Sequence, residues 1–175
     1  MENLRIYRIT NQYVSYLSKR DEKVQYNKGQ RRPYVGVVLY VGQYQYFVPM
    51  ESPKPNHVHI KAGKHIMKLD GGKLGLLGFN NMIPVPPSAI VLVDIDAEPD
   101  EKYAELLRRQ ASFINRNKTA ILSKASETYF SVTNNKNKFL VEISCDFRKL
   151  ERASDRYNPN HKRSPRAKQF YNGKT

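Results

Sequence analysis

The segment PYVGVVLYVGQYQYFVPMESPKPNH, residues 33–57, decides the fold because it contains two apolar runs separated by a short turn. Residues 34–40 are rich in β-branched and aromatic side chains, which is typical of a strand. The Gly-Gln pair at 42–43 predicts a tight turn, after which residues 44–50 return as the antiparallel partner. The segment therefore predicts a β-hairpin, which brings the residues that enter it next to those that leave it.

The end of this hairpin is where we expect chemistry. Pro49 and Pro53 fix their own φ angles and lack an N–H, so the polar loop after the second strand is stiff. The loop carries a carboxylate, a hydroxyl, an ammonium and an imidazole, supplied by Glu51, Ser52, Lys54 and His57. A plain surface turn rich in proline has the same composition, so this alternative stays open.

The residues on either side of the hairpin extend the predicted sheet. Residues 4–9 alternate between apolar and polar, as a strand does, and Thr10 then caps a short amphipathic helix. A long basic loop follows over residues 19–32. Further strands are expected at 59–61, 65–69 and 89–95, and the last of these is expected to be largely buried.

The periodicity changes to a helical one in the second half of the chain. Apolar residues recur at helical spacing over 103–114, and a second helix is expected around 121–129. Residues 139–143 fit a strand or a helix. Residues 144–146 offer a cap for a final helix that ends near residue 157. These patterns predict an α+β fold.

The chain length fits one domain, which we expect to cover residues 1–157 of the 175. Residues 158–175 form a polar, proline-broken basic tail, expected to be mobile until it meets a partner. Its cations predict an arm that follows RNA phosphates, and a solubilising tail is the alternative. The cations of this arm are Lys162, Arg163, Arg166 and Lys168.

The charge balance indicates a polyanionic partner. Thirty Lys and Arg against sixteen Asp and Glu give a formal net charge of +14 and a pI near 9.9. Nucleic acid is the first candidate and an anionic membrane the second. No apolar run is long enough to span a bilayer and no signal peptide opens the chain, so we expect a soluble, cytoplasmic protein.

Basic and aromatic residues alternate in the loop that precedes the hairpin, an arrangement that suits single-stranded RNA because bases stack on aromatic rings between phosphate-binding cations. We expect RNA contacts from Lys28, Arg31, Tyr34 and His57.

Several chemistries lack their sequence signatures. The chain has no Gly-rich phosphate loop, no Gly-x-Ser-x-Gly elbow and no dinucleotide fingerprint, so no nucleotide or flavin cofactor is expected. His57 and His59 would share a strand face, but no third ligand accompanies them and no metal is expected. The single cysteine, Cys145, fits a packed residue better than a nucleophile. RNA cleavage remains, because attack by the substrate's own 2′-OH needs only a base, an acid and cations.

Three motifs in a fixed order make the likeness to known proteins specific: RPYVGVVL at 32–39, YFVPMESPK at 46–54 and NNMIPVP at 80–86. With residues 7–17 and CDFRKLE at 145–151, they resemble the ToxN/AbiQ family. The resemblance implies a sequence-preferring, metal-independent endoribonuclease toxin of a type III toxin–antitoxin system, active in phage defence. It also implies that the toxin cleaves target mRNA, processes its folded repeat antitoxin RNA and is held inactive by that RNA in ring-like assemblies.

The resemblance also implies a fold and a set of site residues. The fold would be a compact, strongly curved, barrel-like antiparallel sheet with surrounding helices, distantly like the Kid/MazF toxins. Ser52 and Lys54 fall on the family's active-site serine and lysine. Arg32 replaces a lysine of better-known members, which keeps the cation but removes a group that could act as a base. Tyr26 matches a family tyrosine, and Glu51 stands in place of a threonine and is a candidate for the base.

The mechanistic hypothesis is in-line attack by the 2′-OH, leaving a 2′,3′-cyclic phosphate and a 5′-hydroxyl. Ser52 would position the phosphate or the 2′-OH, and Lys54 and Arg32 would stabilise the developing charge. A non-catalytic RNA-binding module is the alternative, because it explains the charge and the aromatic residues equally well. A membrane-surface protein is less favoured, because no basic helix carries a bulky apolar face.

Overall fold

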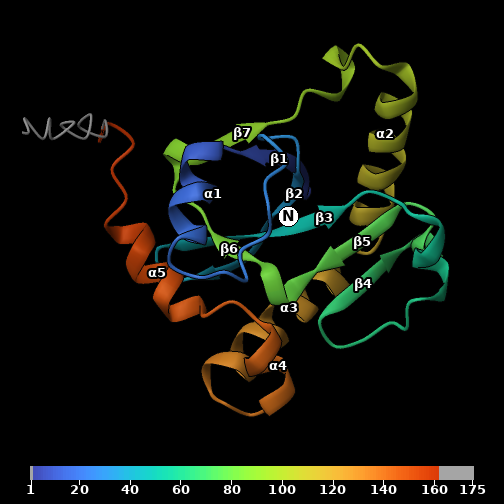
Figure 1. Cartoon of the computed structure of the whole chain (residues 1–175). Helices are drawn as coiled ribbons and strands as arrows, with labels where there is room; N and C mark the ends of the chain where they lie inside the picture. Colours follow the sequence, from blue (N-terminus) through green and yellow to red (C-terminus); the bar gives the residue numbers. More distant parts are fainter. Residues whose placement is uncertain (1, 162–175) are drawn as a thin grey trace, which may run out of the picture.

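The computed structural model describes residues 2–161 and shows an antiparallel sheet followed by helices (Figure 1). The strands are β1 (Arg5–Ile9), β2 (Pro33–Val41), β3 (Tyr44–Glu51), β4 (Ile66–Leu69), β5 (Gly75–Gly78), β6 (Ile83–Pro84) and β7 (Ile90–Leu92). The α-helices are α1 (Asn11–Ser18), α2 (Glu101–Arg116), α3 (Lys118–Thr133), α4 (Lys138–Ile143) and α5 (Phe147–Asp155). Short 3-10 helices include η1 (Pro55–His59) and η2 (Asp70–Gly72). The predicted α+β class is confirmed.

The sheet is open. Its strands follow the order β4-β5-β3-β2-β1-β7, with β6 paired to β3, and every pairing is antiparallel. The edge strands β4 and β7 lie at opposite ends of this order, with only four and three residues. The expected strongly curved, barrel-like sheet was therefore wrong, because these two strands end the sheet instead of pairing with each other.

The central hairpin forms as predicted. Tyr34 pairs with Pro49 and Val35 with Val48, and a register shift follows before Leu39 pairs with Tyr46. Continuing the register outward from the first pair places Arg32 beside Glu51. Two segments distant in sequence therefore meet at this end of the hairpin.

Two predicted strands differ from the structure. Residues 59–61 are not a strand, because the preceding segment turns into η1, which begins at Pro55. A proline at the first helical position suits a helix because its missing N–H has no partner to lose. The strand expected to be largely buried over 89–95 is the short edge strand β7, in which Val91 is 43% exposed and Leu92 50% exposed. The apolar composition of residues 89–95 predicted a strand, but it could not show that this strand would be the last one of the sheet.

The helical half follows the predicted order. Asp100 caps α2 by accepting hydrogen bonds from the backbone N–H groups of Lys102 and Tyr103, and Asp146 caps α5 by accepting from Lys149. The ambiguous residues 139–143 lie in α4. No helix within residues 2–161 is both long and apolar enough to cross a membrane.

The helices pack on the sheet around a buried carboxylate. Glu151 of α5, 4% exposed, accepts hydrogen bonds from the hydroxyls of Tyr46 in β3 and Tyr129 in α3, at 2.8 and 2.6 Å. The rings of Tyr46 and Tyr129 pack edge to face at 5.4 Å. Because a buried carboxylate needs partners, this contact fixes α3 and α5 on the sheet. A single hydrophobic core runs from Leu4 to Ala153.

Candidate active site

The candidate site lies where β3 ends. Glu51 is the last residue of β3, Ser52 and Lys54 lie in the loop that follows, and His57 lies within η1. The chain turns away at Pro53, which cannot donate a hydrogen bond to a neighbouring strand. The predicted polar loop is therefore present.

An ion pair and an imidazole organise this loop. The Lys54 ammonium pairs with one carboxylate oxygen of Glu51, and His57 Nε2 lies 3.8 Å from the other. The Lys54 backbone N–H donates to His57 Nδ1 at 3.3 Å. An imidazole that accepts at Nδ1 carries its proton on Nε2, the atom that faces Glu51. The three side chains therefore form a row, with the carboxylate in the middle.

The carboxylate of Glu51 is held in its ionised form. Partial burial opposes ionisation, but the hydrogen bond and charge of Lys54, with smaller contributions from His57 and Arg32, outweigh it and lower the pKa of Glu51. A lowered pKa makes Glu51 a weaker proton acceptor than an ordinary carboxylate.

The basic loop before β2 faces the same site. Arg32 is only 7% exposed, and its Nε donates to the Tyr26 carbonyl at 2.7 Å. Asn27 holds the loop to the sheet by donating to the Ile9 carbonyl at 2.9 Å. Burial lowers the pKa of Lys28, and the charges of Arg32 and Lys54 lower it further. Cations from two segments therefore converge, as expected at a phosphate-binding site.

Two glycines allow another segment to support the loop from beneath. A Cβ on Gly75 would lie 2.1 Å from the Glu51 carbonyl oxygen, and a Cβ on Gly72 would lie 2.7 Å from the His57 carbonyl oxygen. Both have positive φ angles, +110° and +96°. Lys68 adds a hydrogen bond to the Val58 carbonyl at 2.8 Å. The backbone around η2 therefore packs tightly against the loop that carries the candidate site. The sequence did not predict this contact.

The structure separates the predicted RNA contacts into groups. Lys28 and Arg31 lie in the loop beside the site, with Arg31 Nε bonded to the Lys28 carbonyl at 3.0 Å. The Tyr26 side chain is 77% exposed and open to a stacked base. The tail residues Lys162, Arg163, Arg166 and Lys168 lie outside the described residues.

Two of the expected RNA contacts need correction. Tyr34 is 1% exposed because both faces of β2 are covered there, so its ring belongs to the core and cannot stack on RNA. His57 is also 1% exposed and contacts Glu51 and the Lys54 backbone, so it supports these residues and is too buried to contact RNA. Within residues 2–161, no three His, Cys, Asp or Glu side chains gather as metal ligands would.

Solved structures define the class of protein to which this fold belongs. The chain is similar to a type III toxin studied for its selective inhibition by a non-coding RNA pseudoknot, with a TM-score of 0.79 and 32% identity, covering 88% of this chain and 97% of that one. It is also similar to AbiQ, a lactococcal anti-phage endoribonuclease, with a TM-score of 0.78, 28% identity and coverage of 88% and 97%.

Sequence comparison gives the family. The family model described as "Toxin ToxN, type III toxin-antitoxin system" matches residues 5–155, and the chain belongs to this family. The endoribonuclease ToxN of Bacillus thuringiensis subsp. kurstaki is 32% identical over 95% of this chain and 91% of its own length. The endoribonuclease AbiQ of Lactococcus lactis subsp. lactis is 28% identical over 89% and 90%. The resemblance predicted from the motifs is confirmed.

Proposed function

We propose that the chain, an endoribonuclease toxin of a type III toxin–antitoxin system, cleaves RNA without a metal by using the 2′-OH of the substrate as the nucleophile. The observation that carries this proposal is the convergence of a hydroxyl and several cations at the end of β3. Ser52 and Lys54 come from one side, and Arg32 and Lys28 from the other. In-line attack would leave a 2′,3′-cyclic phosphate and a 5′-hydroxyl.

The roles follow from the environment of each side chain. Lys54 and Arg32 would stabilise the extra negative charge on the phosphorane, because both are cations held beside a strand end. The Ser52 hydroxyl would orient the phosphate or the attacking 2′-OH. Glu51 would hold Lys54 in place until a phosphate oxygen competes for the ammonium. Tyr26, with its exposed ring, would receive a base next to the scissile bond.

The RNA partner is proposed from the relatives. One similar toxin is described as selectively inhibited by a non-coding RNA pseudoknot, and another similar structure concerns a processed non-coding RNA that regulates a bacterial antiviral system. We propose that this chain likewise processes and binds a folded repeat RNA, in a ring-like complex, and cleaves mRNA in the cytoplasm when free of it. Residues 1–157 would form the toxin domain.

Replacing either active-site residue is expected to abolish most cleavage. Ser52→Ala and Lys54→Ala should each lower the rate of RNA cleavage about 10²- to 10⁴-fold, because each removes a group that acts in the transition state. The measurement is cleavage of a labelled RNA by the purified chain in the presence of chelator.

The folded state and the binding of RNA are the controls for this experiment. Both variants should keep the circular dichroism spectrum and RNA affinity of the unmodified chain, since the loop surface is half exposed. Unfolded variants would assign the loop a structural role. Binding of RNA by the unmodified chain without any cleavage would favour the non-catalytic RNA-binding module.

A further inference from the structure

His57 is buried directly under the candidate site. The residue is 1% exposed, whereas the side chains of Glu51 and Lys54 above it are 37% and 53% exposed. His59 lies in the same short helix η1 but is exposed. A buried imidazole needs polar partners, and both partners of His57 are residues of the candidate site. Any effect of His57 on cleavage must therefore pass through these two residues.

The first partner is the backbone of Lys54. The Lys54 N–H donates to His57 Nδ1 at 3.3 Å, and the His57 N–H donates to the Lys54 carbonyl at 3.0 Å. The two bonds form a capping box around the first turn of η1, in which the third helical residue reaches back to the residue that precedes the helix. One residue thus holds Lys54 at both its N–H and its carbonyl.

The backbone of His57 is itself held in place from the other side. A Cβ on Gly72 would lie 2.7 Å from the His57 carbonyl oxygen and 3.1 Å from its Cβ, so the two segments are in close contact. The next residue, Val58, accepts a hydrogen bond from Lys68 at 2.8 Å. The imidazole is therefore attached to a backbone that cannot shift without disturbing η2, and a side chain fixed in this way can position the groups that it contacts.

The second partner is the carboxylate of Glu51. His57 Nε2 lies 3.8 Å from one carboxylate oxygen, and the other oxygen pairs with the Lys54 ammonium. The distance of 3.8 Å is longer than a hydrogen bond, so this contact is electrostatic. When a phosphate oxygen draws the ammonium away from Glu51, the Nε2–H of His57 still faces the carboxylate. His57 thus reaches the Lys54 side chain through Glu51.

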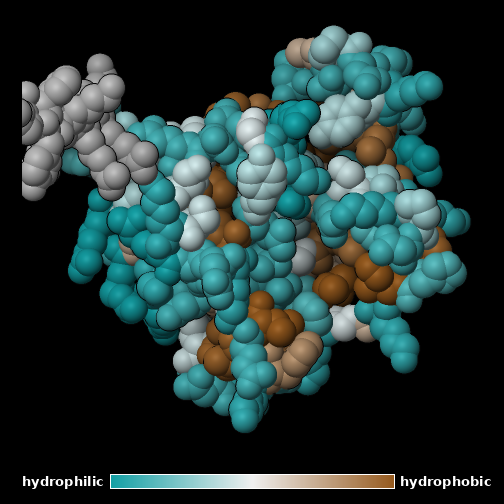
Figure 2. Space-filling view, viewed as in Figure 1, coloured by the Kyte–Doolittle hydropathy of each residue, from teal (hydrophilic) through white to brown (hydrophobic). Residues whose placement is uncertain are grey.

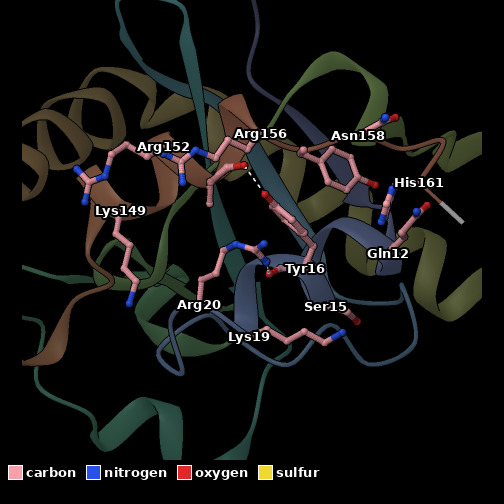
Figure 3. A pocket seen from close by; sticks show the side chains of 12 residues that line it. Gln12, Ser15, Tyr16, Lys19, Arg20, Lys149, Arg152, Arg156, Asn158 and His161 are labelled. Carbon is pink, nitrogen blue, oxygen red and sulfur yellow. Dashed lines mark hydrogen bonds between the residues drawn. The ribbon is translucent and has the colours of Figure 1, made fainter. Parts of the chain in front are cut away.

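Replacing His57 leaves the exposed positive charge of the molecule unchanged. Figure 2 shows mainly hydrophilic side chains over α1 and α5. The groove between these two helices, of about 1260 Å³, contains no Asp or Glu among its lining residues (Figure 3). Its cations are Lys19, Arg20, Lys149, Arg152 and Arg156. Since attraction to a polyanion depends on exposed cations, a substitution of the buried imidazole should affect turnover more than binding.

We propose that His57 is a positioning residue for RNA cleavage, which fixes the backbone of Lys54 through Nδ1 and its ammonium through Glu51. This inference rests on the proposed function for the role of Lys54 in the transition state. A cation stabilises the phosphorane best where it is already in place, because no reorganisation is then needed during the reaction. The imidazole supplies this preorganisation without touching the RNA.

Two conservative variants separate the contacts of His57. In His57→Asn the amide oxygen can take the place of Nδ1 and accept the Lys54 N–H, whereas in His57→Gln the amide nitrogen takes the place of Nε2 and this acceptor is lost. His57→Gln should lower kcat for a short labelled RNA roughly tenfold and change KM less than about threefold. His57→Asn should regain most of the lost kcat.

His59→Gln is the matched control, because it changes an exposed histidine of the same helix, and it should cleave like the unmodified chain. Hydrogen exchange of the Lys54 amide, followed by NMR, reports the backbone contact without any RNA. Exchange should be slow in the unmodified chain and in His57→Asn, and faster in His57→Gln. Faster cleavage by His57→Gln than by His57→Asn would overturn the proposal, as would a raised KM with unchanged kcat. Loss of the fold in both His57 variants would leave only a structural role.

A double variant tests whether His57 acts through Lys54. Lys54→Ala/His57→Gln should cleave no more slowly than Lys54→Ala, because the group that His57 positions is already gone. A further loss in the double variant would show that His57 supports another residue of the loop, contrary to the proposal. If Lys54→Ala cleaves as fast as the unmodified chain, the proposed function fails, while exchange of the Lys54 amide still tests the contact with His57.

Discussion

At the scale of single residues, the ion pair between Glu51 and Lys54 is the central contact of the candidate site. The carboxylate lies between the Lys54 ammonium and the His57 imidazole and is ionised more readily than usual because of those neighbours. A threonine at this position, as the resemblance led us to expect, could not pair with the ammonium in this way. We propose that Glu51 gives this chain its own means of fixing Lys54 at the candidate site.

The ion pair makes stability depend on pH in a definite direction. The pKa of Glu51 is lower in the folded chain than the usual value of about 4.5, so its ionised form stabilises the fold at neutral pH. This contribution is complete above pH 4.5 and is lost as the pH falls through the folded-state pKa. Glu51→Gln should lower the free energy of unfolding by less than about 1 kcal/mol at pH 7, since the pair is partly exposed.

Urea unfolding of both proteins at neutral and acidic pH measures this difference. The gap between the unmodified chain and Glu51→Gln should shrink as the pH is lowered below 4.5. A gap that stays constant would show that the side chain stabilises the fold without its charge. The same variant should lower cleavage by much less than Lys54→Ala, because the Gln amide oxygen can still accept a hydrogen bond from the Lys54 ammonium. A loss as large as that expected for Lys54→Ala would return Glu51 to the role of general base.

At the scale of secondary-structure elements, the site depends on how closely η2 and β5 approach the loop after β3. Gly75 carries a φ of +110° and leaves no room for a Cβ beside the Glu51 carbonyl. Gly75→Ala should therefore cost roughly 2–4 kcal/mol of stability and lower cleavage, because the loop must move to admit the methyl group.

Gly71→Ala is a matched control for this prediction. Gly71 also has a positive φ, +63°, but a Cβ there would meet nothing within 4 Å. It should cost only about 1 kcal/mol and leave cleavage unchanged. Thermal unfolding and cleavage rates of the two variants provide the comparison, and equal effects would contradict the supporting role of the Gly75 contact.

The hairpin could be predicted from sequence because its determinants are local. Two apolar runs and a Gly-containing turn fix the pairing of β2 with β3, and this pairing predicted that Arg32 would lie near Glu51. The burial of Tyr34 could not be predicted, because in a strand covered on both faces the alternation of side chains no longer marks the solvent side.

Features that depend on contacts between distant segments were not predicted, because the sequence does not show which segments lie side by side. The basic face of α5 can be found from the spacing of Lys149, Arg152 and Arg156, but nothing in the sequence shows that α1 lies opposite it. Likewise, the sequence shows glycines at positions 72 and 75, but only the structure places them against η1 and Glu51.

At the scale of the whole molecule, the loop over residues 19–32 joins two basic surfaces, the candidate site and the groove between α1 and α5. The candidate site gathers cations with a serine hydroxyl at the end of β3, and the groove between α1 and α5 is lined by five Lys and Arg side chains and by no carboxylate. The open sheet holds the two surfaces in fixed positions, because one core connects the elements that carry them.

The measurement that tests the central claim most directly is mass spectrometry of the RNA ends that the purified chain produces in the presence of chelator. Attack by the 2′-OH predicts a 2′,3′-cyclic phosphate on one product and a 5′-hydroxyl on the other, with Ser52→Ala producing neither at a comparable rate. A 3′-hydroxyl with a 5′-phosphate, or cleavage that stops when chelator is added, would contradict the proposed mechanism.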